Sequence, residues 1–283
     1  MAFVERPDGA RIRYEVYGAG YPLLLIAPGG VSSSVEFWQR SIIKPPEIFA
    51  DEFMVIAMDQ RHAGQSLAPL RPFSYEQCNA DQVAVLDAVG VEKAHVYGGC
   101  IGCAHIWSLL QHAPGRISAA VAQDPVGLDE TNSIGTFNAM FAPTISLART
   151  SGVEPVLAAA MENPLFVMNN AAGPFAPALH HLESARAEVK ALGGEGYARL
   201  IEDFQAGIWP DNTPYLAARE EFFRACETPI LVIPGRDPFH PTGVGRRICH
   251  TAPNARCLEP DCRDEPNLPT TVETIRAFLR EHR

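Results

Sequence analysis

Runs of apolar residues without interruption recur along this chain and indicate its fold. Residues 23–27 read Leu-Leu-Leu-Ile-Ala, for example, and the full set of runs covers 23–27, 53–58, 95–97, 117–121, 229–233 and 255–259. A strand that is apolar at every position suits a sheet covered on both faces, as parallel sheets are. Two further short strands, at 3–6 and 12–17, flank Pro7-Asp8-Gly9 and predict an opening β-hairpin.

Helical patterns separate these strands. Residues 75–89 and 272–279 carry apolar residues at helical spacing, and 101–111 is rich in helix formers. The alternation predicts an α/β fold: a mostly parallel, twisted sheet with helices on both faces. Residues 126–226 break the rhythm, because they contain helical stretches and many prolines but no strong strand. We expect this segment to be a helical lid inserted after the sixth strand, with 1–125 and 227–283 forming the core.

The segment Gly98-Gly99-Cys100-Ile101-Gly102 lies between a predicted strand and a predicted helix. Gly-x-nucleophile-x-Gly in this setting is the pattern of a nucleophile elbow, here with cysteine at the central position. The sharp turn places that side chain at the N-terminus of the following helix, where backbone N–H groups surround it. A thiol in such surroundings is more acidic than a free one. The pattern therefore predicts that Cys100 is reactive.

Three further segments match loops of one known superfamily: Leu-Ile-Ala-Pro-Gly-Gly at 25–30, Asp-Gln-Arg-His-Ala-Gly-Gln-Ser at 59–66 and Pro-Gly-Arg-Asp-Pro-Phe-His-Pro at 234–241. With the elbow, they make the chain resemble the α/β-hydrolase superfamily over nearly its whole length. The resemblance implies that Cys100 is the nucleophile and that Asp237 is the catalytic acid. It also implies that the backbone N–H groups of Gly30 and Ile101 form an oxyanion hole.

The catalytic histidine that this resemblance implies is missing from its usual place. In the family it follows the last strand in a Gly-His segment, where this chain has Arg263 and Asp264. His240, three residues after Asp237, is our candidate for the base, and His62 is a candidate substrate contact near the mouth of the pocket. We interpret the histidines elsewhere as structural or as part of the lid: His95, His105, His112, His180 and His181.

Three functions are compatible with these residues. The first is hydrolysis of an ester, lactone or thioester of a small apolar molecule through Cys100, with His240, Asp237 or Asp264 activating water. The second is a lyase, isomerase or decarboxylase that uses the same pocket without a covalent intermediate, and the third is binding of a small ligand without catalysis. Candidate substrate contacts are Asp124 and three aromatic residues of the lid, Phe137, Phe141 and Trp209.

The net charge of the chain limits the classes of molecule that we expect it to bind. The chain has 23 Lys and Arg against 33 Asp and Glu, a formal net charge of −10. Nucleic acid and anionic membranes require clustered cations, so we expect neither as a partner. No secretory signal and no run of 18 apolar residues is present, so no membrane-spanning helix is expected. A small molecule remains as the expected partner, and the sequence carries no indication of the oligomeric state.

The seven cysteines are an odd number in a chain of this length. We therefore expect no disulfide framework and a reducing, cytoplasmic location. Cys100-x-x-Cys103 has no second pair and no histidine at zinc spacing, so we expect no metal site. Pro28-Gly29-Gly30 after the first long strand lacks the spacing of a dinucleotide-binding loop, and no cofactor is expected.

Overall fold

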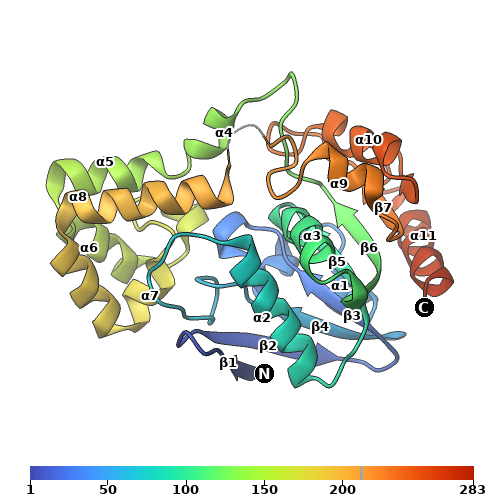
Figure 1. The fold of residues 1–283 in the computed structure, drawn as a ribbon, viewed down its shortest axis with the longest axis horizontal. Helices are drawn as coiled ribbons and strands as arrows, with labels where there is room; N and C mark the ends of the chain where they lie inside the picture. The colour runs from blue at the N-terminus through green and yellow to red at the C-terminus, as the bar shows by residue number, and fades with distance from the viewer. Residues whose placement is uncertain (211–212) are drawn as a thin grey trace.

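The structure, a computed structural model, describes residues 1–210 and 213–283. In this part of the chain eight strands form one sheet with the order β1-β2-β4-β3-β5-β6-β7-β8 (Figure 1). The pairs β1–β2 and β2–β4 are antiparallel and the remaining pairs are parallel. The strands are β1 (Ala2–Glu5), β2 (Arg11–Tyr17), β3 (Tyr21–Ile26), β4 (Phe53–Met58), β5 (Ala94–Gly99), β6 (Ile117–Gln123), β7 (Ile230–Ile233) and β8 (Ala255–Cys257).

The α-helices lie between and beyond these strands, as the alternating pattern predicts. Around the sheet are α1 (Pro45–Ile48), α2 (Tyr75–Ala88), α3 (Ile101–His112), α9 (Glu220–Ala225), α10 (Thr242–Thr251) and α11 (Leu268–Glu281). Between β6 and α9 are α4 (Ile134–Asn138), α5 (Ala142–Ser151), α6 (Glu154–Glu162), α7 (Ala176–His181) and α8 (Glu183–Ile208). The described residues also contain four short 3₁₀ turns: η1 (Gly30–Ser32), η2 (Val35–Arg40), η3 (Pro114–Arg116) and η4 (Phe166–Met168).

The central strands are apolar throughout because both faces of the sheet are covered. Leu24 and Ile26 of β3 pack on the face that α2, α3, α9 and α10 cover. Leu23 and Leu25 pack on the opposite face, against α11 and the segment around α1. Successive side chains of a strand point to opposite sides, so an uninterrupted apolar run fills both layers. The fold class predicted from the sequence is confirmed.

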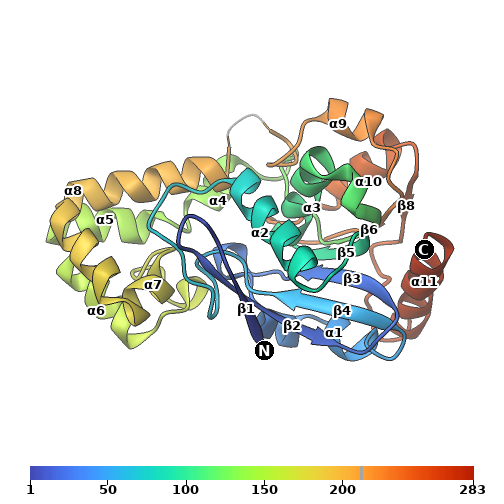
Figure 2. The ribbon, with the colours of Figure 1, turned by 60° about the horizontal axis from the view of Figure 1, so that its bottom comes forward.

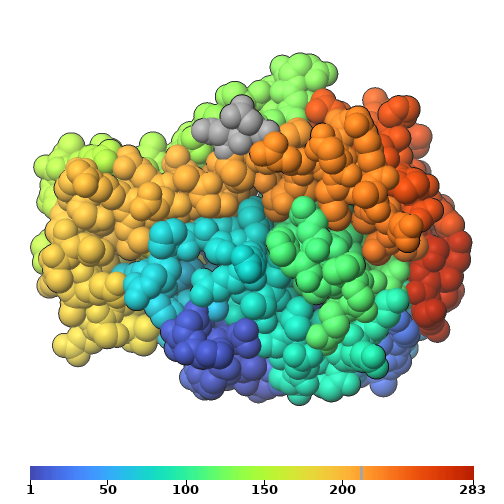
Figure 3. All heavy atoms as spheres, in the orientation of Figure 1, coloured from blue at the N-terminus to red at the C-terminus, as the bar shows by residue number. Residues whose placement is uncertain are grey.

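Helices α4 to α8 form a cap, which lies beside the sheet at the left of Figures 1 and 2. The cap has its own buried cluster, which includes Phe175, Tyr197 and Phe204, and this cluster reaches Ile101 and Ala104 at the start of α3. In the space-filling view of Figure 3, α8 (yellow to orange) lies directly over the α2 region of the core. We therefore propose that the cap covers the end of the sheet from which the elbow projects.

The predicted lid segment, 126–226, extends further than the helices that pack as a cap. Helix α9 packs on the core: Phe223 lies 5.0 Å, ring centre to ring centre, from Trp107 of α3. Tyr215 and Cys226 belong to the same core cluster. We therefore propose that the cap ends before Tyr215. Within the described residues, none of the helices combines the length and the apolar character that crossing a membrane requires.

One expectation about the cysteines is wrong. Cys249 of α10 and Cys257 of β8 form a disulfide, with their Cα atoms 5.9 Å apart. The chain turns back from the helix into the adjacent strand over eight residues, and this turn brings the two Cα atoms within bridging distance. Nothing in the spacing of these cysteines predicts the pairing. The other five cysteines, Cys100 and Cys103 among them, are free.

Candidate active site

Cys100 occupies the tip of the turn between β5 and α3. Its backbone has φ 55° and ψ −118°, a left-handed conformation that is strained for a residue with a side chain. The conformation is held from both sides, because the Cys100 N–H donates to Gln123 O at 2.9 Å and the Cys100 carbonyl accepts from Cys103 N–H at 3.0 Å. The side chain is partly exposed and lines a cavity. The structure thus places the thiol as the elbow pattern predicts.

The glycines of the elbow allow the close crossing of strand and helix. A Cβ on Gly102 would lie 2.2 Å from Ile26 O, and a Cβ on Gly98 would lie 2.6 Å from the carbonyl carbon of Gly102. Both contacts are with backbone atoms, which are unable to rotate away. The small residues are therefore required for the helix to start directly behind the nucleophile position.

Replacing Gly102 by alanine is expected to lower the free energy of unfolding by roughly 3 kcal/mol, because the new methyl group overlaps the β3 backbone. Urea denaturation followed by circular dichroism measures this change. Gly115→Ala is the matched control: its Cβ would meet no heavy atom within 4 Å, so we expect a change within about 0.5 kcal/mol. Equal stabilities of the two variants would contradict the packing described here.

The loop after β7 carries both Asp237 and His240, and the two side chains are paired. His240 Nδ1 lies 2.8 Å from each carboxylate oxygen of Asp237. The backbone N–H groups of Phe239 and His240 also donate to Asp237 Oδ1, at 2.9 and 3.1 Å. The carboxylate is therefore fixed by its own loop, and it sets the orientation of the imidazole ring.

The other ring nitrogen of His240, Nε2, is buried and has no oxygen or nitrogen partner in the described part of the chain. The structure forms no hydrogen bond between Nε2 and the Cys100 sulfur, but the two groups are near enough for the charge of each to shift the pKa of the other. Both residues line the same cavity. Cys100 and His240 thus share one cavity, and His240 contacts Asp237. The histidine comes from the loop of the acid and not from the segment after β8.

The charges of these three groups depend on one another. Burial acts to raise the pKa of Cys100, but the charge of the nearby His240 and the N–H groups of Gly29 and Ile101 outweigh it, and the pKa is lowered. Burial acts to lower the pKa of His240, but the Cys100 thiolate and the Asp237 carboxylate raise it to about 10. The hydrogen bond with His240 lowers the pKa of Asp237 to about 2. A thiolate beside an imidazolium is the arrangement these directions favour.

Backbone N–H groups of two segments act to lower the pKa of the thiol. One belongs to Ile101, at the start of α3, and the other to Gly29, in the loop after β3. Gly29 has φ 115° and a Cβ there would lie 2.8 Å from the Phe37 ring, so only glycine fits. The neighbouring Gly30, with φ 59°, lines the cavity. Its predicted role in the oxyanion hole stays a prediction, while the N–H group of this loop that acts to lower the pKa of the thiol is that of Gly29.

The cavity in front of Cys100 has a volume of about 430 Å³, the size of a small-molecule site. Of the predicted substrate contacts, Phe137, Trp209 and Asp124 line it. One wall is apolar and comes mostly from the cap and the acid loop: Val126, Phe137, Met140, Val167, Trp209 and Phe239.

Two predicted substrate contacts lie elsewhere. His62 is buried and packs edge-on against Phe175 and Phe204 of the cap, 4.9 and 5.9 Å between ring centres, outside the cavity wall. Burial lowers its pKa to about 3, so the ring is neutral and part of the interface between core and cap. Phe141 is fully buried and packs on Phe166 within the cap. Sequence position placed His62 near the pocket mouth and made Phe141 a candidate contact from the lid, but the cap packs over His62 and Phe141 lies in the interior of the cap.

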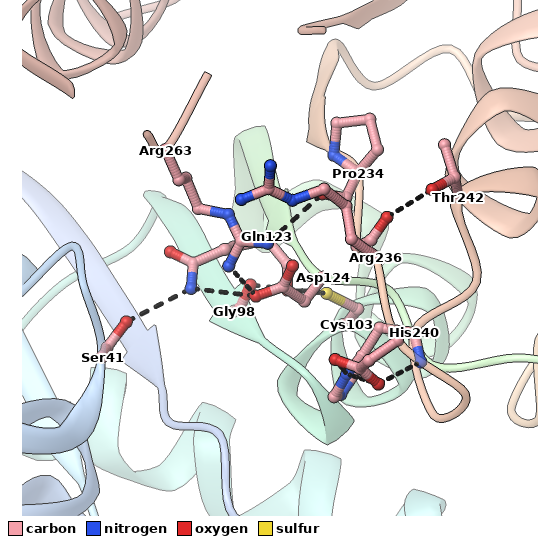
Figure 4. Close-up of polar contacts among 12 residues, drawn as sticks. Ser41, Gly98, Cys103, Gln123, Asp124, Pro234, Arg236, His240, Thr242 and Arg263 are labelled. Atoms are coloured by element: carbon pink, nitrogen blue, oxygen red, sulfur yellow. Dashed lines mark hydrogen bonds and ion pairs between the residues drawn. The ribbon is translucent and has the colours of Figure 1, made fainter. Parts of the chain in front are cut away.

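The segment that usually supplies the histidine carries two salt bridges. Arg263 pairs with Asp124 at the end of β6, and its Nη2 donates to Pro234 O at 3.5 Å (Figure 4). Asp264 accepts from Arg236 at 2.7 Å and is half exposed, outside the cavity wall. The sequence analysis interpreted this segment only as one that lacks the catalytic histidine, and it did not identify Arg263 as a residue of the cavity. The signal was a long cation at the position where the superfamily has the glycine of its Gly-His segment.

Comparison with known proteins gives concordant results. A sequence profile described as alpha/beta hydrolase fold matches residues 22–268. A stretch of 108 residues is 38% identical to a putative carbamate hydrolase, RutD, of Azorhizobium caulinodans, but covers only 38% of each chain. The 3-oxoadipate enol-lactonase 2 of Acinetobacter baylyi is 24% identical over 84% of this chain and 80% of its own. The crystal structure of a hydrolase from Pseudomonas aeruginosa PA01 superposes with a TM-score of 0.63 at 22% identity, covering 98% of this chain and 97% of that one.

Proposed function

Since this chain belongs to the alpha/beta hydrolase fold family, we propose that it hydrolyses an ester, lactone or thioester of a small, partly apolar molecule through a covalent intermediate on Cys100. The observation that carries this proposal is the Cys100 thiol lining a cavity beside His240, which is bonded to Asp237. The names of two relatives, an enol-lactonase and a carbamate hydrolase, support the class of reaction. Cysteine takes the part that serine usually plays.

In the first half of the reaction the Cys100 thiolate attacks the carbonyl carbon of the substrate. A carbon–sulfur bond forms, and the carbonyl oxygen becomes an oxyanion that the N–H groups of Gly30 and Ile101 stabilise. When this intermediate collapses, the bond to the leaving group breaks and the leaving oxygen or sulfur takes a proton from His240 Nε2. The products are a thioester on Cys100 and a neutral His240.

In the second half a water molecule replaces the leaving group. Neutral His240 accepts a proton from the water, which attacks the thioester carbonyl and releases Cys100 as a thiolate. Acylation removes the thiolate charge that raises the pKa of His240, so the ring gives up its proton readily in the first half and is free to act as a base in the second. Asp237 orients the ring in both halves by holding Nδ1.

The absence of a histidine from the segment between β8 and α11 does not leave Cys100 without a base in this proposal. His240 reaches the thiol from the β7 loop, and a thiol needs less activation than a hydroxyl because its ordinary pKa is much lower. Asp264, which we also considered as an activator of water, is bonded to Arg236 and lies outside the cavity wall. We therefore assign the base role to His240 alone.

Cys100 is expected to react with iodoacetamide at pH 6.5 at least about tenfold faster than a free thiol such as glutathione, because its lowered pKa leaves more thiolate at that pH. Peptide mapping by mass spectrometry measures the rate at each cysteine. Cys78, Cys226 and Cys262 are internal controls, since burial raises the pKa of each. Labelling of Cys100 only above pH 9 would contradict the thiolate–imidazolium pair.

Experiments can distinguish this reaction from the two other functions considered in the sequence analysis. A lyase, isomerase or decarboxylase would turn over its substrate with no acyl group on Cys100, and a ligand-binding protein would return its ligand unchanged. The proposed reaction uses a small-molecule substrate and no cofactor. The cytoplasmic location stays a prediction, and the Cys249–Cys257 disulfide speaks against it.

A further inference from the structure

A second part of the cavity lining is polar. It consists of five side chains, Arg40, Ser41, Gln123, Asp124 and Arg263. Figure 4 shows four of them joined in one series of polar contacts that runs from Ser41 through Gln123 and Asp124 to Arg263. The substrate of the reaction proposed above therefore meets fixed charges and hydrogen-bonding groups as well as apolar surface.

The contact with Tyr97 determines the direction of the hydrogen bonds in this series. Tyr97 is fully buried, and its hydroxyl donates to Gln123 Oε1 at 2.7 Å. The amide nitrogen of Gln123 is therefore the end that points to Ser41 Oγ, at 3.2 Å, and to Asp124 Oδ2, at 3.4 Å. Because Ser41 Oγ accepts this bond, its own proton is free to donate. A hydroxyl donor is thus available at the cavity wall.

Not every charged side chain that lines the cavity is neutralised by a partner of opposite charge. Arg263 is neutralised by Asp124, which it contacts directly, and His240 is balanced by Asp237 and Cys100. Arg40 has no carboxylate partner among residues 1–210 and 213–283. Its guanidinium instead lies over the Phe37 ring, 4.9 Å from the ring centre, and both residues line the cavity. The stacking holds a free cation at the rim.

We propose that the Arg40 guanidinium and the Ser41 hydroxyl form a carboxylate-binding subsite, so that the substrate is an acidic molecule. This inference rests on the proposed function, and it narrows the substrate to an ester, lactone or thioester that carries a carboxylate at a distance from the scissile carbonyl. A guanidinium and a neighbouring hydroxyl match the two oxygens of a carboxylate. In a chain with a net charge of −10, an acidic substrate needs such a local cation to enter.

The test compares two esters with acyl chains of equal length, mono-(4-nitrophenyl) adipate and 4-nitrophenyl hexanoate. We expect kcat/KM of the native protein to be at least about tenfold higher for the adipate, the effect of one charge-assisted contact. Arg40→Gln should abolish this preference while changing kcat/KM for the hexanoate less than about twofold, and Arg40→Lys should restore part of it. Arg71→Gln removes an exposed arginine that does not line the cavity and should leave the preference intact.

A second measurement separates failure of this inference from failure of the proposed function. Protection of Cys100 from iodoacetamide by monomethyl adipate or methyl hexanoate requires binding but no turnover. Stronger protection by the adipate, lost in Arg40→Gln, supports the subsite even if neither ester is hydrolysed. Equal protection by both compounds, or an Arg40→Gln variant that loses both activities equally, would overturn it.

Discussion

Replacing Cys100 by alanine is expected to lower kcat/KM for hydrolysis of a short 4-nitrophenyl ester by at least about a thousandfold, since it removes the group that forms the covalent bond. The measurement is release of 4-nitrophenolate at several substrate concentrations, with circular dichroism to show that the fold is intact. The backbone at this position is strained, and alanine accepts that strain no worse than cysteine does. The variant should therefore fold.

Cys226→Ala is the matched control for this substitution. Cys226 is a buried free cysteine between α9 and β7, and it does not line the cavity. Loss of its sulfur should leave kcat/KM within about twofold, because it lies outside the reacting groups. Full activity in Cys100→Ala would exclude covalent catalysis at this residue and would favour a reaction without an intermediate on the enzyme.

Replacing His240 by glutamine is expected to lower kcat/KM by about 10²- to 10⁴-fold, the range of a lost general acid–base group. The same change removes the positive charge that lowers the pKa of Cys100, so burial then dominates and the pKa rises. The sign is testable: at pH 6.5 iodoacetamide should label the variant more slowly than the native protein, with the difference closing as the pH rises. Rates of labelling and of ester hydrolysis across pH 5.5–9.5 provide the measurement.

Two further variants define which acid supports the base. Asp237→Asn should lower kcat/KM by about a hundredfold, because an amide holds the ring less firmly and in a different proton arrangement. Asp264→Asn, at the position where the superfamily has its histidine, should lower it less than about threefold, since its carboxylate pairs with Arg236 outside the cavity. A large loss in Asp264→Asn together with a small loss in His240→Gln would reverse our assignment of the base.

Local features of this molecule were predictable from the sequence because short-range sterics decide them. The apolar runs of β3 and β4 require cover on both faces, and this requirement fixes a parallel sheet. The elbow at Cys100 follows in the same way, because Gly98 and Gly102 are the residues that the tight crossing needs. The pairing of His240 with Asp237 was within reach too, since both belong to one loop.

Features that depend on distant parts of the chain were not predictable. Arg263 and Asp124 are 139 residues apart and meet only when the loops after β6 and β8 converge. His62 was placed near the pocket, but the cap covers it with Phe175 and Phe204. No pattern along the sequence shows how the helices of the cap pack on the core. The polar wall around Ser41 and Gln123 was missed for the same reason.

The central claim, that Cys100 carries the acyl group, is tested most directly by intact-mass spectrometry of protein quenched in acid during turnover of a 4-nitrophenyl ester. We predict a mass increase equal to one acyl group, located by digestion to the peptide that contains Cys100, and its absence in Cys100→Ala. Steady hydrolysis with no adduct on Cys100, sustained in Cys100→Ala, would contradict the account.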